Sequence, residues 1–231
     1  MANDIVEVLE NIPFNVKREQ VMGRLKLRQK SEQIETMVDE LIEQTQTVVR
    51  PKAIYRVSWV DKKTSDGVEI DGVKFTSRVL RANLDKVERV FPYVATCGRE
   101  LEEIKVPPGD VLRAYCLDVI KMLALGIAIA FFSETVKRRY ALGQTSHMNP
   151  GSLEDWPLTQ QKQLFSLFGD VEKSIGVRLT ESLVMYPLKS TSGIYFTSEI
   201  RFESCQLCPR EKCIGRRAPY SPELAQKYLG S

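Results

Sequence analysis

A largely apolar stretch of fourteen residues, VIKMLALGIAIAFF at positions 119–132, constrains the fold more than any other feature of the sequence. Asp110 suits the N-cap of a helix that starts just after it, and Gly143 suits the end of that helix. Because the middle of this helix is apolar nearly all round, other elements must cover it. A membrane-spanning helix needs about 20 apolar residues, and this stretch is shorter and contains Lys121. We therefore expect a long central buried helix over residues 110–142 and no membrane contact.

The remaining segments predict an α+β fold with a mainly antiparallel, twisted sheet packed with helices. Pro51 ends a helix with periodic apolar positions, and Asp71-Gly72 suits the tight turn of a hairpin. We expect one domain over residues 1–203 and a Cys-rich C-terminal tail over residues 204–231. The expected helices cover residues 17–47, which pack on the domain, and 80–90, 159–168 and 222–228; the expected strands cover 53–60, 68–75, 93–96, 177–186 and 193–198; residues 144–157 are expected to form a loop.

Composition excludes several classes of protein. The formal net charge is only +3, which gives no strong field for nucleic acid or a membrane surface. Residues 1–10 contain no basic residue and so do not resemble a secretory signal, which predicts a cytoplasmic protein with reduced cysteines. We find neither a Ser-His-Asp arrangement nor a glycine-rich phosphate loop.

Two stretches of the C-terminal half carry a distinctive set of motifs. The first is NPG at positions 149–151, and the second combines LTES at 179–182, MYP at 185–187 and STSGIYF at 190–196. Together they resemble the reactivation domain of cobalamin-dependent methionine synthase, in the form of a free-standing relative found beside corrinoid methyltransferases. The resemblance extends over residues 50–200 and is concentrated after residue 145.

The resemblance implies a fold and a chemistry. Members of this family bind S-adenosylmethionine in a curved α+β domain and dock against a cobalamin domain whose cobalt has been oxidised to Co(II). A flavodoxin-like or ferredoxin-like partner supplies one electron, and S-adenosylmethionine supplies the methyl group. Methylation removes the strongly reducing Co(I) product and so draws an uphill reduction forward. The domain would hold the sulfonium methyl facing the cobalt, which is a positioning role.

The same resemblance implies which residues bind the cofactor. Pro150 and Gly151 match the family's proline-glycine turn, and Tyr195 matches an aromatic residue that contacts the adenosyl group. The predicted cofactor-binding set is His147, Asn149, Pro150, Gly151, Ser152 and Tyr195. The chain also departs from the family pattern: His147 falls where the family has an arginine, Ser152 where it has a tyrosine, and Gly126 or Ala130 where it has a helical acid.

A cluster of cysteines in the tail is the strongest local signal in the sequence. Cys205, Cys208 and Cys213 form a Cys-x2-Cys-x4-Cys array, whose first pair has the spacing with which two thiolates grip one metal ion or cluster. Cys97, which follows a predicted strand, is the candidate fourth ligand. Three interpretations stay open: an iron–sulfur cluster for electron delivery, a structural zinc ion, and free thiols on a loose tail.

The leading hypothesis is an accessory catalyst for reductive methylation of a corrinoid cofactor held on another protein. A second hypothesis is a non-catalytic module that binds a corrinoid protein. A third is an iron–sulfur reductive activator that works without S-adenosylmethionine. The missing charged residues of the family favour the second hypothesis, whereas Tyr195 and the proline-glycine turn favour the first.

Overall fold

The computed structural model describes residues 6–27, 31–199, 202–213 and 216–229. The α-helices are α1 (Arg18–Arg24), α2 (Glu32–Val48), α3 (Arg78–Asn83), α4 (Val111–Arg139), α5 (Gln161–Ser166), α6 (Val171–Ile175) and α7 (Pro222–Leu229). The short 3-10 helices are η1 (Arg99–Glu103), η2 (Leu158–Gln160) and η3 (Ser204–Leu207). The strands are β1 (Val6–Leu9), β2 (Lys52–Arg56), β3 (Ser58–Lys63), β4 (Gly67–Ile70), β5 (Val73–Thr76), β6 (Arg89–Thr96), β7 (Thr145–Met148), β8 (Arg178–Leu179), β9 (Met185–Tyr186) and β10 (Ser190–Thr197).

An antiparallel sheet of eight strands forms the centre of the molecule, and β6 is its middle strand. On one side β6 pairs with β2 and β3, and on the other it pairs with β10, which in turn pairs with the edge strand β7. Strands β8 and β9 form a separate small hairpin. The predicted α+β class with a mainly antiparallel sheet is confirmed.

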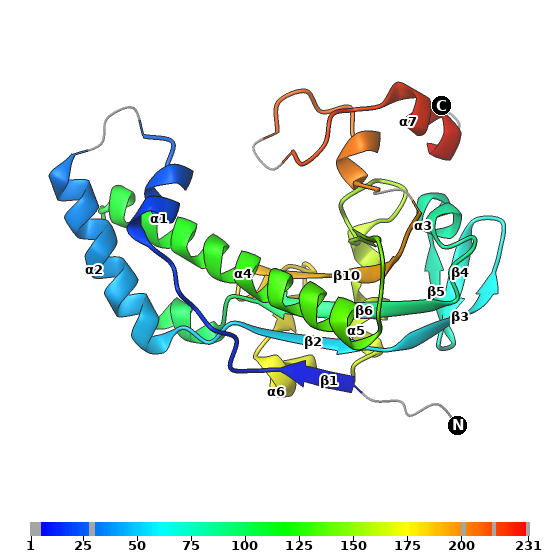
Figure 1. Ribbon diagram of the computed structural model, residues 1–231, viewed down its shortest axis with the longest axis horizontal. Coiled ribbons are helices and arrows are strands. Elements are labelled where there is room, and N and C mark those ends of the chain that lie inside the picture. The colour runs from blue at the N-terminus through cyan, green and yellow to red at the C-terminus, as the bar shows by residue number, and fades with distance from the viewer. Residues whose placement is uncertain (1–5, 28–30, 200–201, 214–215, 230–231) are drawn as a thin grey trace.

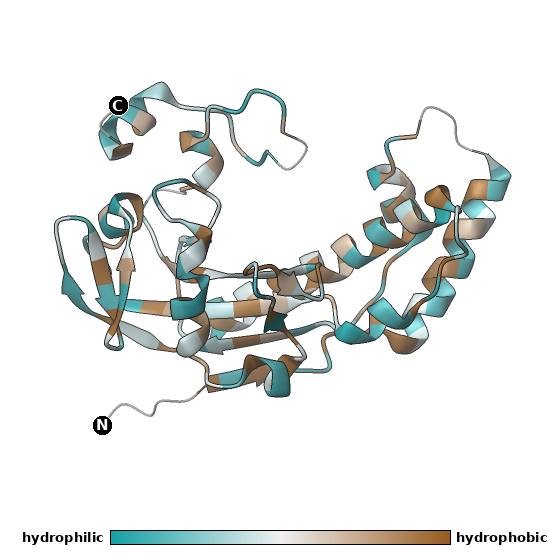
Figure 2. Ribbon diagram, turned by 180° about the vertical axis from the view of Figure 1, so that it is seen from behind, coloured by the Kyte–Doolittle hydropathy of each residue, from teal (hydrophilic) through white to brown (hydrophobic). Residues whose placement is uncertain are grey.

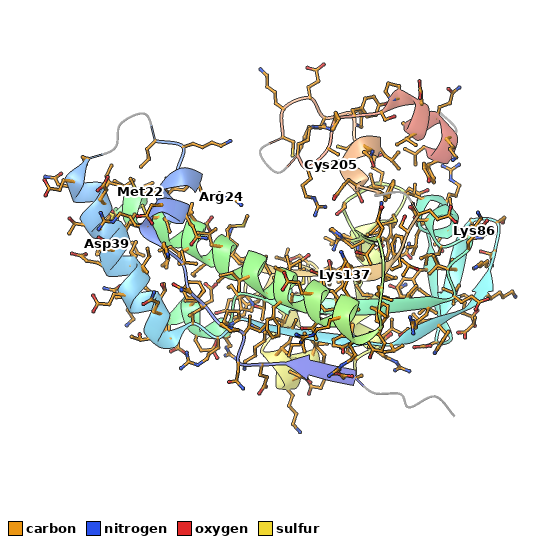
Figure 3. The ribbon with its side chains drawn as sticks, viewed as in Figure 1. Met22, Arg24, Asp39, Lys86, Lys137 and Cys205 are labelled. Carbon is orange, nitrogen blue, oxygen red and sulfur yellow. The ribbon has the colours of Figure 1, made fainter. Side chains whose placement is uncertain are left out.

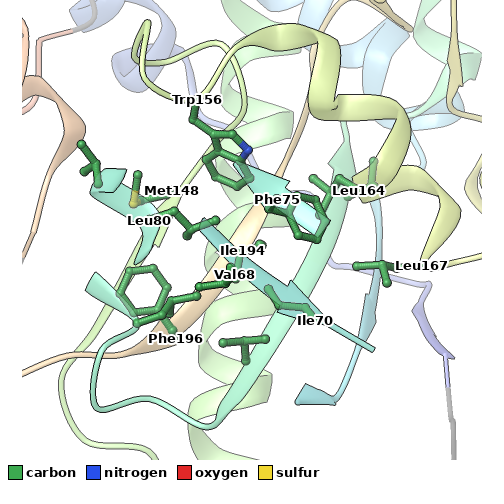
Figure 4. Packing of buried hydrophobic residues seen from close by; sticks show 14 of the residues in the cluster. Val68, Ile70, Phe75, Leu80, Met148, Trp156, Leu164, Leu167, Ile194 and Phe196 are labelled. Atoms are coloured by element: carbon green, nitrogen blue, oxygen red, sulfur yellow. The ribbon is translucent and has the colours of Figure 1, made fainter. Parts of the chain in front are cut away.

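Both faces of the sheet are covered, because successive strand residues point to opposite sides. Along β6, Val90 and Val94 join a core that contains the β4–β5 hairpin, α3, α5 and α6. Phe91 and Tyr93 point the other way and pack against α4. Figure 4 shows part of the first core, where Trp156 is fully buried and its ring meets Phe75 edge-on at 6.1 Å.

The predicted long central helix is confirmed as α4. The Asp110 side chain caps it by accepting a hydrogen bond from the Arg113 amide at 2.9 Å. Its buried face packs against β2, β6, α1 and α2, but an opposite stripe stays uncovered, and Met122 is 50% exposed. By length and composition alone α4 could cross a membrane, a test that the core helix of a soluble protein also passes.

The overall shape is curved, with α1 and α2 forming one arm and the C-terminal segment the other (Figure 1). In Figure 3, Cys205 lies on the arm opposite Met22 and Arg24. Figure 2 shows hydrophobic residues along the strands of the sheet and mainly hydrophilic colour on the loop of the C-terminal arm.

Several local predictions are confirmed and several are wrong. The Asp71-Gly72 hairpin turn is present, with φ of 48° and 76° at its two residues. The single helix expected over residues 17–47 is two helices, because α1 ends at Arg24 and α2 has its own N-cap at Ser31. The single strand expected over residues 53–60 is likewise two, β2 and β3. Residues 145–148, expected in a loop, form β7, because they pair with β10.

The C-terminal tail packs on the body. Phe202, Leu207 and Ala225 are buried in the same apolar core as the β4–β5 hairpin. Helix α7 contacts α3 and η3. The part of the tail that the structure describes is therefore not loose, as the free-thiol alternative assumed, and the state of its cysteines stays a prediction.

Candidate functional site

The predicted cofactor-binding residues meet where β7 lies along β10. In this antiparallel pair His147 lies opposite Tyr195, and Met148 lies opposite Ile194. Tyr93 lies opposite Gly193 on the neighbouring strand pair. The rings of Tyr93 and Tyr195 both contact Phe132 of α4, with centroid distances of 4.6 and 5.4 Å. The site is therefore built on the face of the sheet that α4 covers.

Asn149 holds the end of β7 against the neighbouring strands. Its Nδ2 donates to the Ser192 carbonyl at 2.6 Å and to the Tyr93 hydroxyl at 3.1 Å. A Cβ atom on Gly193 would lie 2.4 Å from the Met148 carbonyl and 2.5 Å from Asn149 Nδ2. The glycine of the STSGIYF motif is therefore required for this close approach, and Asn149 Nδ2 is already engaged in holding the strands together.

The proline-glycine turn is closed by its own backbone. The Gly151 amide donates to the Trp156 carbonyl at 2.7 Å, and the Ser152 amide donates to the Asn149 carbonyl at 3.2 Å. Gly151 has a φ of +82°, which favours glycine. Pro150 is buried, whereas Ser152 is exposed. The turn is thus a fixed edge of the site, with the Ser152 side chain open to solvent.

Tyr93 and Tyr195 contribute buried phenols. The Tyr195 hydroxyl forms a hydrogen bond of 2.7 Å with Thr145 Oγ1, and burial raises the pKa of Tyr195. Burial also raises the pKa of Tyr93, against the opposing effects of its Asn149 hydrogen bond and the charge of Arg217. Both side chains are therefore neutral donors and acceptors at physiological pH. Sequence reasoning placed Tyr93 only on a strand and did not include it in the site.

His147 has a partner that sequence reasoning missed. Arg217 Nη1 lies 2.9 Å from His147 Nε2, and Arg217 Nε lies 3.3 Å from Glu203 Oε2. A guanidinium only donates, so His147 Nε2 accepts this hydrogen bond. Arg217 comes from the tail, 70 residues from His147 in sequence, and no local motif marks the contact.

The structure does not bring the four predicted metal ligands together. Cys97 follows the end of β6 that pairs with Ser190, whereas the tail continues from the far end of β10, beyond Thr197. Across the described ranges, no group of three or more His, Cys, Asp or Glu side chains is placed to hold a metal ion. The proposed role of Cys97 as fourth ligand is thus not supported, and metal binding by Cys205, Cys208 and Cys213 stays a prediction.

Cys97 instead belongs to the interior. Its side chain is fully buried, and its Sγ donates to the Gly98 carbonyl at 3.5 Å. Burial, reinforced by the charge of Glu102, raises the pKa of its thiol to about 12. By contrast, Cys205 and Cys208 are half-buried and Cys213 is exposed. The tail cysteines are therefore the accessible ones.

A cavity of about 600 Å³ lies away from these residues. It opens between α3, α7 and the end of β10, where Lys86, Phe202 and Tyr228 line it. None of the predicted cofactor-binding residues lines this cavity. The predicted cofactor-binding residues at the β7–β10 edge therefore lie apart from this hollow.

Comparison with known proteins identifies the motif-bearing region. Residues 144–206, from the start of β7 to η3, match the family described as "Vitamin B12 dependent methionine synthase, activation domain". The chain carries the activation-domain signature. This confirms the resemblance inferred from the LTES and STSGIYF motifs. No curated protein sequence matches the chain.

A solved structure shares the whole fold. It is described as "Crystal Structure of the MetH Reactivation Domain bound to AdoHcy", and it is similar at a TM-score of 0.59 over 99% of this chain and 90% of that chain. The sequence identity is 13%, so the likeness shows the fold. The activation-domain signature and the reactivation-domain fold thus agree, and the signature covers both strands of the β7–β10 pair.

Proposed function

We propose that this protein takes part in the reductive reactivation of a cobalamin cofactor held on another protein, with S-adenosylmethionine as methyl donor. The observation that carries the proposal is the activation-domain match over residues 144–206. Those residues include His147, Asn149 and Tyr195, which the structure brings to one edge of the sheet. The similar reactivation domain solved with AdoHcy supports the choice of ligand.

The proposed reaction has two steps, a one-electron reduction of the cobalt and a methyl transfer. A one-electron donor of the flavodoxin or ferredoxin class reduces the partner's Co(II) to Co(I). The Co(I) then takes the methyl group from the sulfonium of S-adenosylmethionine, giving methyl-Co(III) and S-adenosylhomocysteine. The role of this chain is to hold the sulfonium compound in place against the partner, so positioning is its main contribution to the rate.

The residues at the β7–β10 edge suit part of such a ligand. The half-buried His147 ring is the more accessible of the two opposite residues of the strand pair, because Tyr195 is only 6% exposed and packs against Phe132. The turn at Gly151 is closed by its own backbone and leaves the Ser152 side chain exposed beside it. The acidic and aromatic groups of the family pattern are replaced by Ala130 or Gly126 and by Ser152. We therefore expect the ligand to bind more weakly than in a protein that has all of these groups.

Isothermal titration calorimetry on the full chain tests the proposal. S-adenosylhomocysteine and S-adenosylmethionine should each bind with saturable heat at one site per chain, and ATP should not. Absence of heat at millimolar ligand would sink the methyl-donor part. A second assay combines the chain with a cobalamin-binding domain of methionine synthase in the Co(II) state, Ti(III) citrate and methyl-labelled S-adenosylmethionine. We expect the label to be transferred to the cobalamin faster when this protein is present than when it is omitted.

A non-catalytic module that binds a corrinoid protein is the second candidate. The uncovered stripe of α4, with Met122 half-exposed, and the absent charged groups favour it. In that case the chain would bind the cobalamin domain but neither S-adenosylmethionine nor S-adenosylhomocysteine.

The tail cysteines connect to the third candidate, an iron–sulfur activator that needs no S-adenosylmethionine. Anaerobic purification with an absorption spectrum and iron and zinc analysis decides between cluster, zinc and free thiols. A colourless, metal-free protein under those conditions would rule out both metal predictions.

A further inference from the structure

One arginine folds the loop of the C-terminal tail. The Arg216 guanidinium donates to the carbonyls of Cys205, Cys208 and Ala218, each at 3.1 Å, and also to that of Arg210. A single side chain thereby ties together backbone groups from both ends of the loop. Because a guanidinium carries five donors in a fixed fork, it is well suited to this task.

The start of the tail is anchored beside the candidate site. Phe202 is buried in the core, and its amide donates to Ser146 Oγ at 2.9 Å, directly next to His147. Leu207 and Ala225 anchor η3 and α7 in the same core. The segment that leads into the Arg216-folded loop is therefore anchored beside β7.

Arg217, the next residue, reaches back from this loop to the site. Its Nη1 contacts His147, and its Nε pairs with Glu203, whose side chain is only 11% exposed. The Arg217 side chain itself is 47% exposed. Within the described residues, Arg217 Nη2 makes no hydrogen bond. A nearly buried carboxylate and a histidine therefore orient a half-exposed guanidinium that keeps one donor nitrogen without a hydrogen bond among the described residues.

We infer that Arg217 binds the carboxylate of the amino-acid part of the ligand at the β7–β10 edge, so that the tail completes the site. The inference rests on the proposed function, because it concerns the same site. An arginine fork pairs with a carboxylate through two parallel hydrogen bonds, and Nη2 with Nη1 presents such a fork. Glu203 holds the fork in place through Nε, the nitrogen that this pairing leaves out.

The test compares two ligands with two proteins. S-adenosylhomocysteine carries the carboxylate, whereas 5′-methylthioadenosine has the same nucleoside and lacks the amino-acid part. Replacing Arg217→Gln should weaken binding of S-adenosylhomocysteine about 10-fold or more, the usual loss for a charged hydrogen bond, and leave 5′-methylthioadenosine within about 2-fold. Arg217→Lys, which keeps the charge, should recover part of the loss.

Arg210→Gln is the matched control, because it removes the same charge from an exposed position of the same loop. It should leave both affinities unchanged. Thermal unfolding of each variant checks that the tail still packs.

If Arg217→Gln weakens the binding of both ligands equally, Arg217 only holds the tail in place. If it weakens the binding of neither, Arg217 contacts no ligand. Either result overturns the inference and leaves the proposed function intact. Failure of the unaltered protein to bind S-adenosylhomocysteine would instead overturn both.

Discussion

Two neighbouring regions, the strands β6, β10 and β7 and the loop of the C-terminal tail, are held by different forces. They meet where Arg217 of the tail contacts His147 of β7. Phe132 of α4 stacks on Tyr93 and meets Tyr195 edge-on, which makes the strands part of an aromatic core. The loop of the tail is held by guanidinium groups, Arg216 on backbone carbonyls and Arg217 on Glu203. The strands therefore depend on dense packing, and the loop depends on a few polar contacts.

This difference explains where the family signature lies. Gly193 and Asn149 lie within the matched residues 144–206 and let β7 and β10 approach closely. The tail lies mostly beyond the matched residues 144–206, and it carries Arg217, which contacts His147. Function depends on the groups that surround such a scaffold, and here one of those groups, Arg217, lies outside the matched residues.

The largest expected effect is on the aromatic core. Phe132→Ala should lower the free energy of unfolding by about 4 kcal/mol, because it leaves a cavity beneath three tyrosines, Tyr55, Tyr93 and Tyr195. Denaturant unfolding measures the loss. Met122→Ala on the uncovered stripe of the same helix is the control and should change stability by less than about 0.5 kcal/mol. A loss for Phe132→Ala as small as that of the control would contradict the proposed packing.

A smaller effect is expected at the β7–β10 contact. Gly193→Ala should destabilise the protein by about 2 kcal/mol, because its Cβ would push against the Met148 carbonyl and Asn149. Gly126→Ala on α4 is the matched control, since a Cβ there has no atom within 4 Å. In a helix this change should stabilise by about 0.5–1 kcal/mol. Unfolding curves that coincide for the two variants would show that the contact at Gly193 is not tight.

The elements with local signals were predicted well from sequence. Asp110 and the apolar run specify α4, and Asp71-Gly72 specifies the hairpin, because caps and tight turns depend on neighbouring residues. Strand β7 was missed because its four residues, TSHM, carry no strong β pattern and become a strand only through pairing with β10. The break between α1 and α2 was missed although residues 28–33, RQKSEQ, interrupt the apolar pattern, because the periodic positions that supported the helix all lie in α2.

The site was predictable only in part. His147, Asn149 and Tyr195 do come together, because the motifs mark the strands that carry them. The contact of Arg217 with His147 spans 70 residues, and its geometry depends on how the tail folds back, which no short pattern encodes. Cys97 was grouped with the tail because it is a cysteine that follows a predicted strand, but the length of β10 separates it from the start of the tail.

The smallest effect on global stability is expected in the tail loop. Arg216→Ala removes four carbonyl contacts, but the loop is largely exposed, so the free energy of unfolding should fall by less than about 1 kcal/mol. Local opening should nevertheless increase, and hydrogen exchange of peptides covering residues 205–221 should become faster, with Arg210→Ala as the unchanged control. The strands β7 and β10 should keep their slow exchange. Faster exchange in those strands as well would show that loop and sheet open as one unit, and the contrast between a packed scaffold and a loop held by polar contacts would then not hold.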